Sequence, residues 1–349
     1  MNRRSALLLL LLACAQLPRV PGSEHSDLVF ERYTPLSSNA ELARRVLTPL
    51  TVRRGEEAMA TNKTALREQP IDLAKEKFSI YVPGRTPPKE GYGLLVFVAP
   101  WEERGTPKTW RLALDLRDLI FVVAGASGNE TRLYDRRMPL ALLAYENVRA
   151  RYHVDPKRTY VGGLSGGSRT AEALALAYPD VFRGALLNAG SNPIGNESEF
   201  RLPPAELFAQ FQHTRLVYVT GEKDEEHINE DLTSRNSMRS WCVFNEEVMT
   251  VAKVGHEPLD AGSFGRAHDL LDRPGSPGSI DERKLAECNA GLQRDLAAKV
   301  AEADAAIARG DRDRARSLIY SLDGRYSGFA EKQVLELDTK LAARMPTAR

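Results

Sequence analysis

The chain has 349 residues, and its 48 Lys and Arg residues nearly balance its 47 Asp and Glu residues, for a net charge of +1. This balance argues against a nucleic-acid-binding protein, whose affinity depends on a strongly basic surface. Forty-two per cent of the residues are hydrophobic, which is enough to fill a core and excludes a chain disordered throughout. The length allows about two domains, or one large domain with an appendage.

The N-terminus has the three parts of a secretory signal peptide, predicted over residues 1–23. Arg3 and Arg4 form a short basic head, and apolar residues follow from Ala6 to Ala13. This apolar stretch is shorter than the roughly 20 residues that a membrane-spanning helix needs. No later stretch reaches that length, so we expect no transmembrane span.

Two cleavage sites are compatible with this segment. The letters "ACA" at 13–15 suit an ordinary signal peptidase, whereas "LLAC" at 11–14 resembles a lipobox in which Cys14 receives a lipid anchor. Both predict export, to the periplasm, to the extracellular space or to a lipid-anchored position on the cell envelope.

Two cysteines remain, Cys242 and Cys288. In an oxidising compartment an even pair can form a disulfide. Two buried thiols fit the sequence equally well, and the pattern does not separate these alternatives.

The pattern along the chain predicts an α/β protein. Residues 24–75 form a mixed N-terminal segment with helical stretches, and residues 76–275 alternate short β-branched runs with helical segments. The runs are 78–83, 93–100, 119–124, 158–164, 184–190, 214–221 and 247–255, and the clearest helical segments are 138–154, 168–180 and 229–244. This alternation predicts a mostly parallel sheet with helices on both faces, whose strands all end at one edge.

The composition changes after the Gly-, Pro- and Ser-rich letters "RPGSPGS" at 273–279. Residues 281–345 carry apolar positions at helical spacing, such as Leu285, Leu292 and Leu296. We expect an all-helical appendage there. It has no motif of its own, and we interpret it as a packing surface or a surface for a protein partner.

The letters "GLSGG" at 163–167 match the G-x-S-x-G pattern of a nucleophile elbow. A predicted strand precedes them and a predicted helix follows, as the elbow requires. A Gly-rich phosphate-binding turn is the alternative, but the spacing fits neither of the usual phosphate-loop patterns. Ser165 is therefore the predicted nucleophile, and the backbone N–H of Gly166 is one predicted donor of an oxyanion hole.

A serine nucleophile needs a base and an acid that orients the base. In a fold of this kind the acid follows the serine along the chain, and the histidine base follows the acid. Asp224 comes shortly after the run that ends near Thr220, and it is the predicted acid. The alternative is an acidic surface turn that caps the next helix. His256, directly after a strand and Gly255, is the predicted base.

The other five histidines fit the role of the base less well. His25, His153 and His213 come too early or lie away from strand ends, and His268 falls inside a helical segment. His227 is set aside because it is only three residues from Asp224. The predicted chemistry is acyl transfer, in which Ser165 attacks a carbonyl carbon and His256 carries the proton.

Three stretches carry a family resemblance: "YHVDPKRTYVGGLSGGSRTAEALALAYPDVFRGALLNAG" (152–190), "VYVTGEKDEEH" (217–227) and "VGHEP" (254–258). They are similar to the α/β-hydrolase superfamily, in particular to the secreted esterases that include polyhydroxybutyrate depolymerases and feruloyl esterases. The likeness covers roughly residues 76–272. It implies an α/β-hydrolase sheet and cleavage of a small-molecule or polymeric carboxylic ester by a serine hydrolase.

The chain departs from this family after the run at 93–100. A His-Gly pair is usual there, but this chain has Ala99 and Pro100, followed by Trp101. Pro100 has no N–H to donate, so the N–H of Trp101 is the predicted second oxyanion donor. Trp101 as a packing residue is the alternative.

The loop at 125–135 also follows a predicted strand, and its Asn129 and Glu130 are predicted substrate contacts. We expect no metal and no cofactor, because no His, Cys and Asp cluster has zinc spacing and no nucleotide loop is visible. Two alternatives stay open: a serine peptidase or acyltransferase with the same triad, and a catalytically inactive cell-envelope binding protein whose C-terminal helices form its interaction surface.

Overall fold

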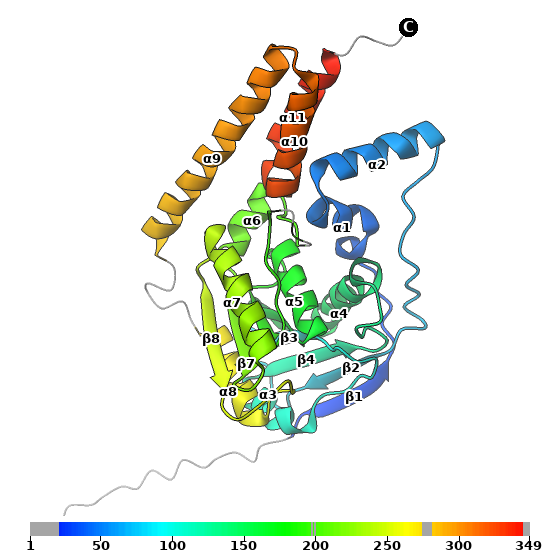
Figure 1. Ribbon diagram of the computed structural model, residues 1–349. Helices are drawn as coiled ribbons and strands as arrows, with labels where there is room; N and C mark the ends of the chain where they lie inside the picture. Colours follow the sequence, from blue (N-terminus) through cyan, green and yellow to red (C-terminus); the bar gives the residue numbers. More distant parts are fainter. Residues whose placement is uncertain (1–20, 197, 199, 274–280, 345–349) are drawn as a thin grey trace, which may run out of the picture.

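The computed structural model describes residues 21–196, 198, 200–273 and 281–344. Cys14, and nearly all of the predicted signal peptide, lie outside the described residues. The described chain forms one eight-stranded sheet in the order β1-β2-β4-β3-β5-β6-β7-β8 (Figure 1). Its strands are β1 (Ser23–Leu28), β2 (Phe78–Val82), β3 (Tyr92–Val98), β4 (Leu119–Ala124), β5 (Val154–Leu164), β6 (Gly184–Asn188), β7 (Arg215–Gly221) and β8 (Glu246–Val251).

The prediction of a mostly parallel sheet is confirmed. All neighbouring strands from β4 to β8 pair in parallel, while β2 pairs antiparallel with both β1 and β4. Every residue of β3, β4, β6 and β7 is buried, as expected for strands covered on both faces. Each of the seven predicted β-branched runs overlaps one strand.

Strand β1 was not predicted. Its sequence "SEHSDL" is polar and mostly exposed, and it lies at the edge of the sheet with β2 as its one neighbour. An edge strand of this kind buries little surface, so its sequence lacks the alternating hydrophobic residues that would predict a strand. The sheet thus begins at Ser23, where the predicted signal peptide meets the 24–75 segment, and we expected no strand there.

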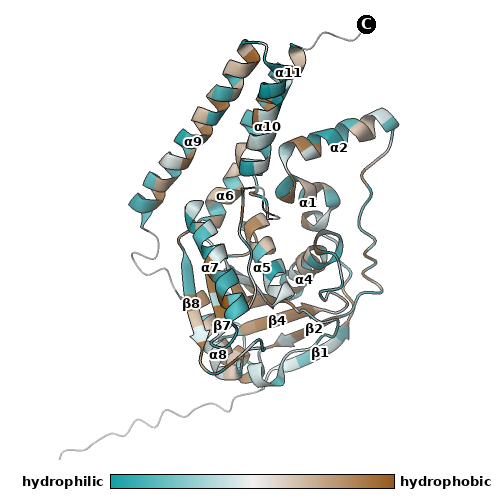
Figure 2. Cartoon of the chain, viewed as in Figure 1, coloured by the Kyte–Doolittle hydropathy of each residue, from teal (hydrophilic) through white to brown (hydrophobic). Residues whose placement is uncertain are grey.

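Helices cover both faces of the sheet (Figure 1). On one face lie α4 (Met138–Arg151), α5 (Gly166–Ala177) and α7 (Glu225–Ser240); on the other lie α3 (Arg111–Leu116) and α8 (Ala261–Leu271). The second face is closed by Trp110 and Phe264, whose rings stack 4.2 Å apart. Figure 2 shows the hydrophobic strands between these helical layers and more hydrophilic outer helix faces.

The remaining helices lie mainly beyond the α4–α5–α7 face, and the helical appendage is confirmed. They are η1 (Pro35–Ser37), α1 (Asn39–Val46), α2 (Pro49–Asn62), η2 (Lys108–Trp110), η3 (Leu133–Arg137), α6 (Ala205–Phe211), α9 (Glu282–Ala308), α10 (Arg312–Tyr326), η4 (Ser327–Ala330) and α11 (Glu331–Ala343). Among the described residues, no helix is both long enough and apolar enough to span a bilayer.

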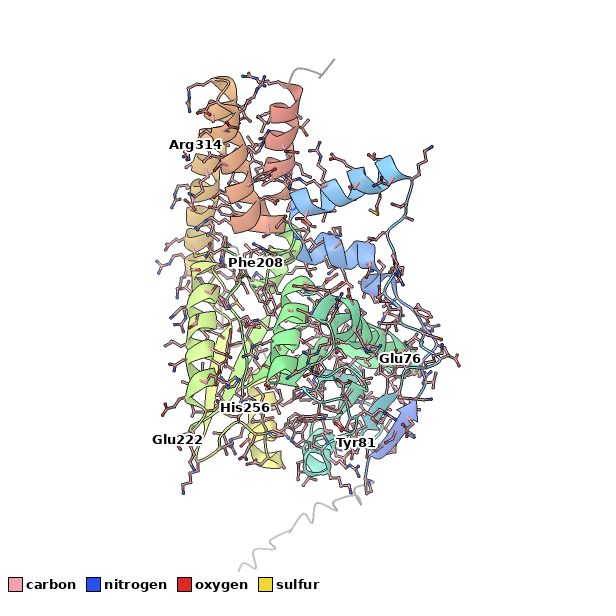
Figure 3. The ribbon with its side chains drawn as sticks, turned by 45° about the vertical axis from the view of Figure 1, so that its right-hand side comes forward. Glu76, Tyr81, Phe208, Glu222, His256 and Arg314 are labelled. Atoms are coloured by element: carbon pink, nitrogen blue, oxygen red, sulfur yellow. A yellow bond between two sulfur atoms is a disulfide. The ribbon has the colours of Figure 1, made fainter. Side chains whose placement is uncertain are left out.

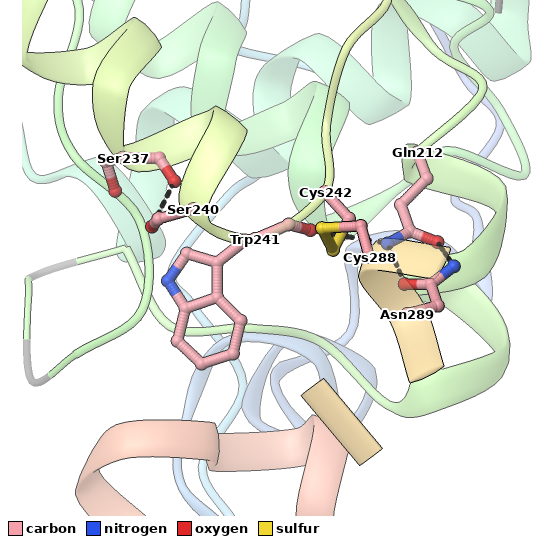
Figure 4. The surroundings of a disulfide bond; sticks show 7 residues. All are labelled: Gln212, Ser237, Ser240, Trp241, Cys242, Cys288 and Asn289. Carbon is pink, nitrogen blue, oxygen red and sulfur yellow. Dashed lines mark hydrogen bonds between the residues drawn. A yellow bond between two sulfur atoms is a disulfide. The ribbon is translucent and has the colours of Figure 1, made fainter. Parts of the chain in front are cut away.

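The appendage is joined to the sheet domain by a disulfide. Cys242, just after α7, is bonded to Cys288 in α9 (Figure 4). Beside it, the Gln212 and Asn289 side-chain amides exchange hydrogen bonds of 2.8 and 3.1 Å. The two cysteines that the sequence left as a disulfide or as free thiols therefore form a covalent link between domain and appendage.

Candidate active site

Ser165 lies at the turn between β5 and α5 with a backbone φ of 55° and ψ of −125°. A non-glycine residue rarely adopts a positive φ, so the surrounding structure must hold this conformation. A Cβ at Gly163 would lie 2.2 Å from the carbonyl carbon of Gly167, and a Cβ at Gly167 would lie 2.0 Å from the Val98 carbonyl oxygen. These approaches explain the two flanking glycines of the motif, and the turn has the geometry of a nucleophile elbow.

Asp224 and His256 form the acid–base pair of the site. Asp224 lies three residues beyond β7 and is the N-cap residue of α7, and its side chain is buried. His256 lies five residues beyond β8, and its side chain is 40% exposed. His256 Nδ1 is 2.8 Å from Asp224 Oδ2. With the carboxylate ionised, Nδ1 carries the proton and donates it to this bond, which leaves Nε2 free to accept a proton.

His227 also contacts Asp224, which the sequence reasoning missed. Its Nδ1 lies 2.8 Å from Asp224 Oδ1, and its ring stacks on that of His256 with 4.2 Å between centroids. The short separation along the chain was the reason for setting His227 aside. In the folded chain this separation produces the contact, because Asp224 occupies the N-cap position of α7 and a residue three positions later lies on the same side of the helix.

The two imidazoles determine the charge of Asp224. Burial acts to raise the pKa of its carboxyl group, but hydrogen bonds from His227 and His256 outweigh burial and hold the pKa below its usual value. The carboxylate is therefore ionised at neutral pH, as an orienting acid must be.

Ser165 and the acid–base pair occupy the same edge of the sheet. Strands β5, β6, β7 and β8 are parallel neighbours, so the segments that follow β5, β7 and β8 emerge together. Figure 3 shows His256 at the end of the molecule opposite Arg314 of the appendage. Within the described ranges, no hydrogen bond joins the Ser165 hydroxyl to either histidine. The structure thus brings Asp224 and His256 together, and the contact of Ser165 with His256 stays a prediction.

The segments predicted to supply oxyanion donors lie against each other. Gly166 is the first residue of α5, so its N–H has no partner within the helix. The Pro100 carbonyl accepts a 3.0 Å hydrogen bond from the Asn129 N–H, which ties the Trp101 segment to the loop after β4. Trp101 is 38% exposed and is not a core residue.

The two predicted substrate contacts have different surroundings. A Cβ at Gly166 would lie 2.2 Å from Asn129 Oδ1, so the Asn129 amide lies directly beside the elbow. Glu130 is exposed. In the described part of the chain it forms no hydrogen bond to the other candidate residues.

A buried polar layer lies between α5 and α7, and sequence reasoning did not predict it. Asp231 accepts hydrogen bonds from Ser191 and Thr220, at 2.6 and 2.5 Å. Glu172 accepts a 2.9 Å bond from the Ser234 hydroxyl, and burial raises its pKa to about 8. Such a layer joins the helix of the nucleophile to the helix of the acid.

The acid and the two histidines also form a possible metal-binding set. One ligand atom from each of Asp224, His227 and His256 lies within 4.8 Å of the others, and these are the residues that meet this condition in the described chain. The set does not have the short ligand spacing of a zinc motif, because His256 is 32 residues from Asp224 along the chain. Hydrogen bonds among the three side chains account for their proximity.

The comparisons with known proteins give limited matches. No family model matches the chain. A 45-residue stretch is 47% identical to poly(3-hydroxyalkanoate) depolymerase C of Paucimonas lemoignei, and it covers 13% of this chain and 11% of that protein. The matched stretch thus spans about a tenth of the relative.

Some solved structures are similar to this chain at low sequence identity. A ferulic acid esterase matches 56% of this chain and 89% of its own, with 13% identity and a TM-score of 0.40. The BES protein from Bacillus cereus matches 59% and 93%, with 12% identity and a TM-score of 0.44. With scores below 0.5, these likenesses support no argument about this chain. Its own sheet order and the elbow after β5 correspond to the α/β-hydrolase fold that the motifs predicted.

Proposed function

We propose that this chain is a serine hydrolase that cleaves a carboxylic ester through Ser165, His256 and Asp224. The observation that carries the proposal is the hydrogen bond between Asp224 and His256, at the sheet edge where the strained Ser165 turn lies. An ionised acid that orients an imidazole is the arrangement that makes a neighbouring serine hydroxyl nucleophilic.

The reaction proceeds by acyl transfer in this proposal. His256 Nε2 takes the proton of the Ser165 hydroxyl as Oγ attacks the ester carbonyl carbon. The tetrahedral intermediate collapses when His256 returns the proton to the leaving alcohol, which leaves an acyl-enzyme. Water, deprotonated by His256, then attacks the acyl group and releases the acid and free Ser165.

The negative charge of the tetrahedral intermediate needs hydrogen-bond donors. The N–H groups of Gly166 and Trp101 are the proposed oxyanion hole, and Asn129 and Glu130 are proposed substrate contacts. The short gap between the Asn129 amide and Gly166 supports a place for Asn129 beside the scissile bond. Removing one oxyanion donor from other enzymes lowers kcat by roughly 10²–10³-fold.

The sequence features outside the site complete the proposal. We infer export from the basic and apolar N-terminus, with Cys14 as the lipid-anchored residue if the lipobox is used. The disulfide between Cys242 and Cys288 supports an oxidising compartment. The short stretch shared with a depolymerase supports an ester substrate, small or polymeric. The appendage is a candidate surface for a protein partner.

Hydrolysis of model substrates tests this function and its alternatives. We expect the wild type to hydrolyse p-nitrophenyl esters over a series of acyl lengths and Ser165→Ala to lose this activity. A chelator should leave the rate unchanged, which separates serine chemistry from a metal held by Asp224 and the two histidines. Faster cleavage of peptide amides would favour a peptidase, and transfer of the acyl group to an added alcohol a transferase. No turnover of any substrate would favour the inactive binding protein.

A further inference from the structure

Arg137 is a buried arginine that contacts the backbone of the candidate site. It is the last residue of η3, a π-helical turn that leads into α4, and only 6% of it is exposed. Its guanidinium donates three hydrogen bonds: Nε to the Ser127 carbonyl at 2.9 Å, and the two terminal nitrogens to the carbonyls of Gly166 and Ala99 at 3.1 Å each. π-Helical turns of this kind are frequent at functional sites.

These three carbonyls belong to the three segments that build the proposed oxyanion hole and its border. Ala99 follows β3, Ser127 follows β4, and Gly166 follows the nucleophile after β5. The peptide that carries the Ala99 carbonyl precedes the peptide with the Trp101 N–H. The peptide that carries the Gly166 carbonyl follows the peptide with the Gly166 N–H. Arg137 therefore donates a hydrogen bond to the peptide group next to each proposed oxyanion donor.

The positive charge of Arg137 has no close counter-ion. Within the described ranges, no carboxylate lies close enough to form an ion pair with it. By contrast, the adjacent Arg136 forms a two-pronged pair with Glu76 at 2.9 and 2.7 Å. Burial lowers the pKa of Arg137 to about 10, partly opposed by the exposed Glu102, so the guanidinium is charged at neutral pH.

A buried cation without a counter-ion is costly, because burial removes the water that would stabilise its charge. Carbonyl dipoles supply part of the missing stabilisation here. Negative charge that develops nearby during a reaction would supply more. In the proposed mechanism such charge develops on the substrate carbonyl oxygen, next to Gly166 and Trp101.

We propose that Arg137 is a positioning residue that holds the two oxyanion donor segments together, and that its unpaired charge favours the anionic tetrahedral intermediate over the neutral ester. This inference rests on the proposed serine hydrolase function. It predicts a defect in transition-state stabilisation rather than in substrate binding.

The test compares Arg137→Met and Arg137→Lys with Arg136→Met as the matched control. The readouts are kcat and KM for a p-nitrophenyl ester, the inhibition constant of phenylboronic acid, and the thermal midpoint. Phenylboronic acid is the probe because its tetrahedral adduct with the serine carries the negative charge of the intermediate.

For Arg137→Met we expect both kcat and boronic-acid affinity to fall by roughly 10²-fold, the size of an oxyanion-hole loss, with KM nearly unchanged. Arg137→Lys keeps the charge but not the three-pronged geometry, and should recover about 10-fold of the loss. Arg136→Met should behave like the wild type in kcat and inhibition.

Unchanged kcat and boronic-acid affinity in a folded Arg137→Met would overturn the inference. An equal fall for Met and Lys, with KM raised in parallel, would also overturn it and would indicate a structural role alone. If Arg137→Met does not fold, Arg137→Lys decides the outcome by the same split between kcat and KM. A wild type that neither hydrolyses esters nor binds the boronic acid refutes the proposed function itself.

Discussion

The two halves of the candidate site are held in different ways. The nucleophile half is held by backbone: Ser165 is strained, and Gly163 and Gly167 approach neighbouring chain so closely that a Cβ would collide. The acid–base half is held by side chains, since two imidazoles meet one carboxylate and His256 is 40% exposed. The first arrangement allows little change of residue, whereas the second offers two candidate bases for one acid.

Removing each histidine in turn is the strongest way to separate the two candidate bases. We expect His256→Ala to lower kcat for an ester by roughly 10⁴–10⁶-fold, because the residue that accepts the serine proton is lost. His227→Ala should lower kcat by less than about 10-fold, because it removes one of two bonds to Asp224. Steady-state kinetics on folded variants measures both. The reverse ranking would make His227 the base.

Substitutions in the half of the site that is held by backbone should lower the stability of the fold. Gly163→Ala places a Cβ 2.2 Å from the Gly167 carbonyl carbon, so we expect a loss of about 1–3 kcal/mol or more in the free energy of unfolding. Gly55→Ala is the control, because a Cβ there meets nothing within 4 Å and alanine favours the helix. Urea unfolding followed by circular dichroism compares them. Equal stability of Gly163→Ala and the wild type would contradict the tight packing of the elbow.

A third histidine, His268, makes the stability of the fold depend on pH. This effect must be distinguished from the pH dependence of activity at the candidate site. His268 in α8 is fully buried, and burial lowers its pKa from 6.5 to about 4. Between these values the unfolded chain binds a proton that the folded chain does not, so stability falls as the pH is lowered from 6.5 to 4. The effect amounts to at most about 3 kcal/mol.

His268→Phe should remove this acid-induced loss and leave the pH profile of ester hydrolysis unchanged. Thermal midpoints measured between pH 4 and 7 provide the check, with His213→Gln, at an exposed histidine, as the control. If His268→Phe retains the full acid-induced loss, another group is responsible for it.

Features that depend on local sequence patterns could be predicted, whereas features that depend on contacts between distant residues could not. Buried strands and the elbow follow from local patterns: continuous apolar runs and glycines at fixed distances from Ser165. Asp224 and His256 were predicted from chain order, and the structure joins them. The contact of His227 with Asp224 is local, at a separation of three residues, but it depends on where α7 begins. The β1 pairing and the three bonds of Arg137 depend on neighbours brought in by the fold, and no local pattern encodes them. The cysteine pairing was left open for the same reason.

Covalent labelling of Ser165 tests the central claim most directly. A fluorophosphonate reacts with a serine only where a base and an oxyanion hole activate it, and peptide mass spectrometry identifies the modified residue. We expect the wild type to be labelled at Ser165, Ser165→Ala to stay unlabelled, and His256→Ala to react far more slowly. Absence of label on folded wild-type protein, or label on another serine, would contradict the account.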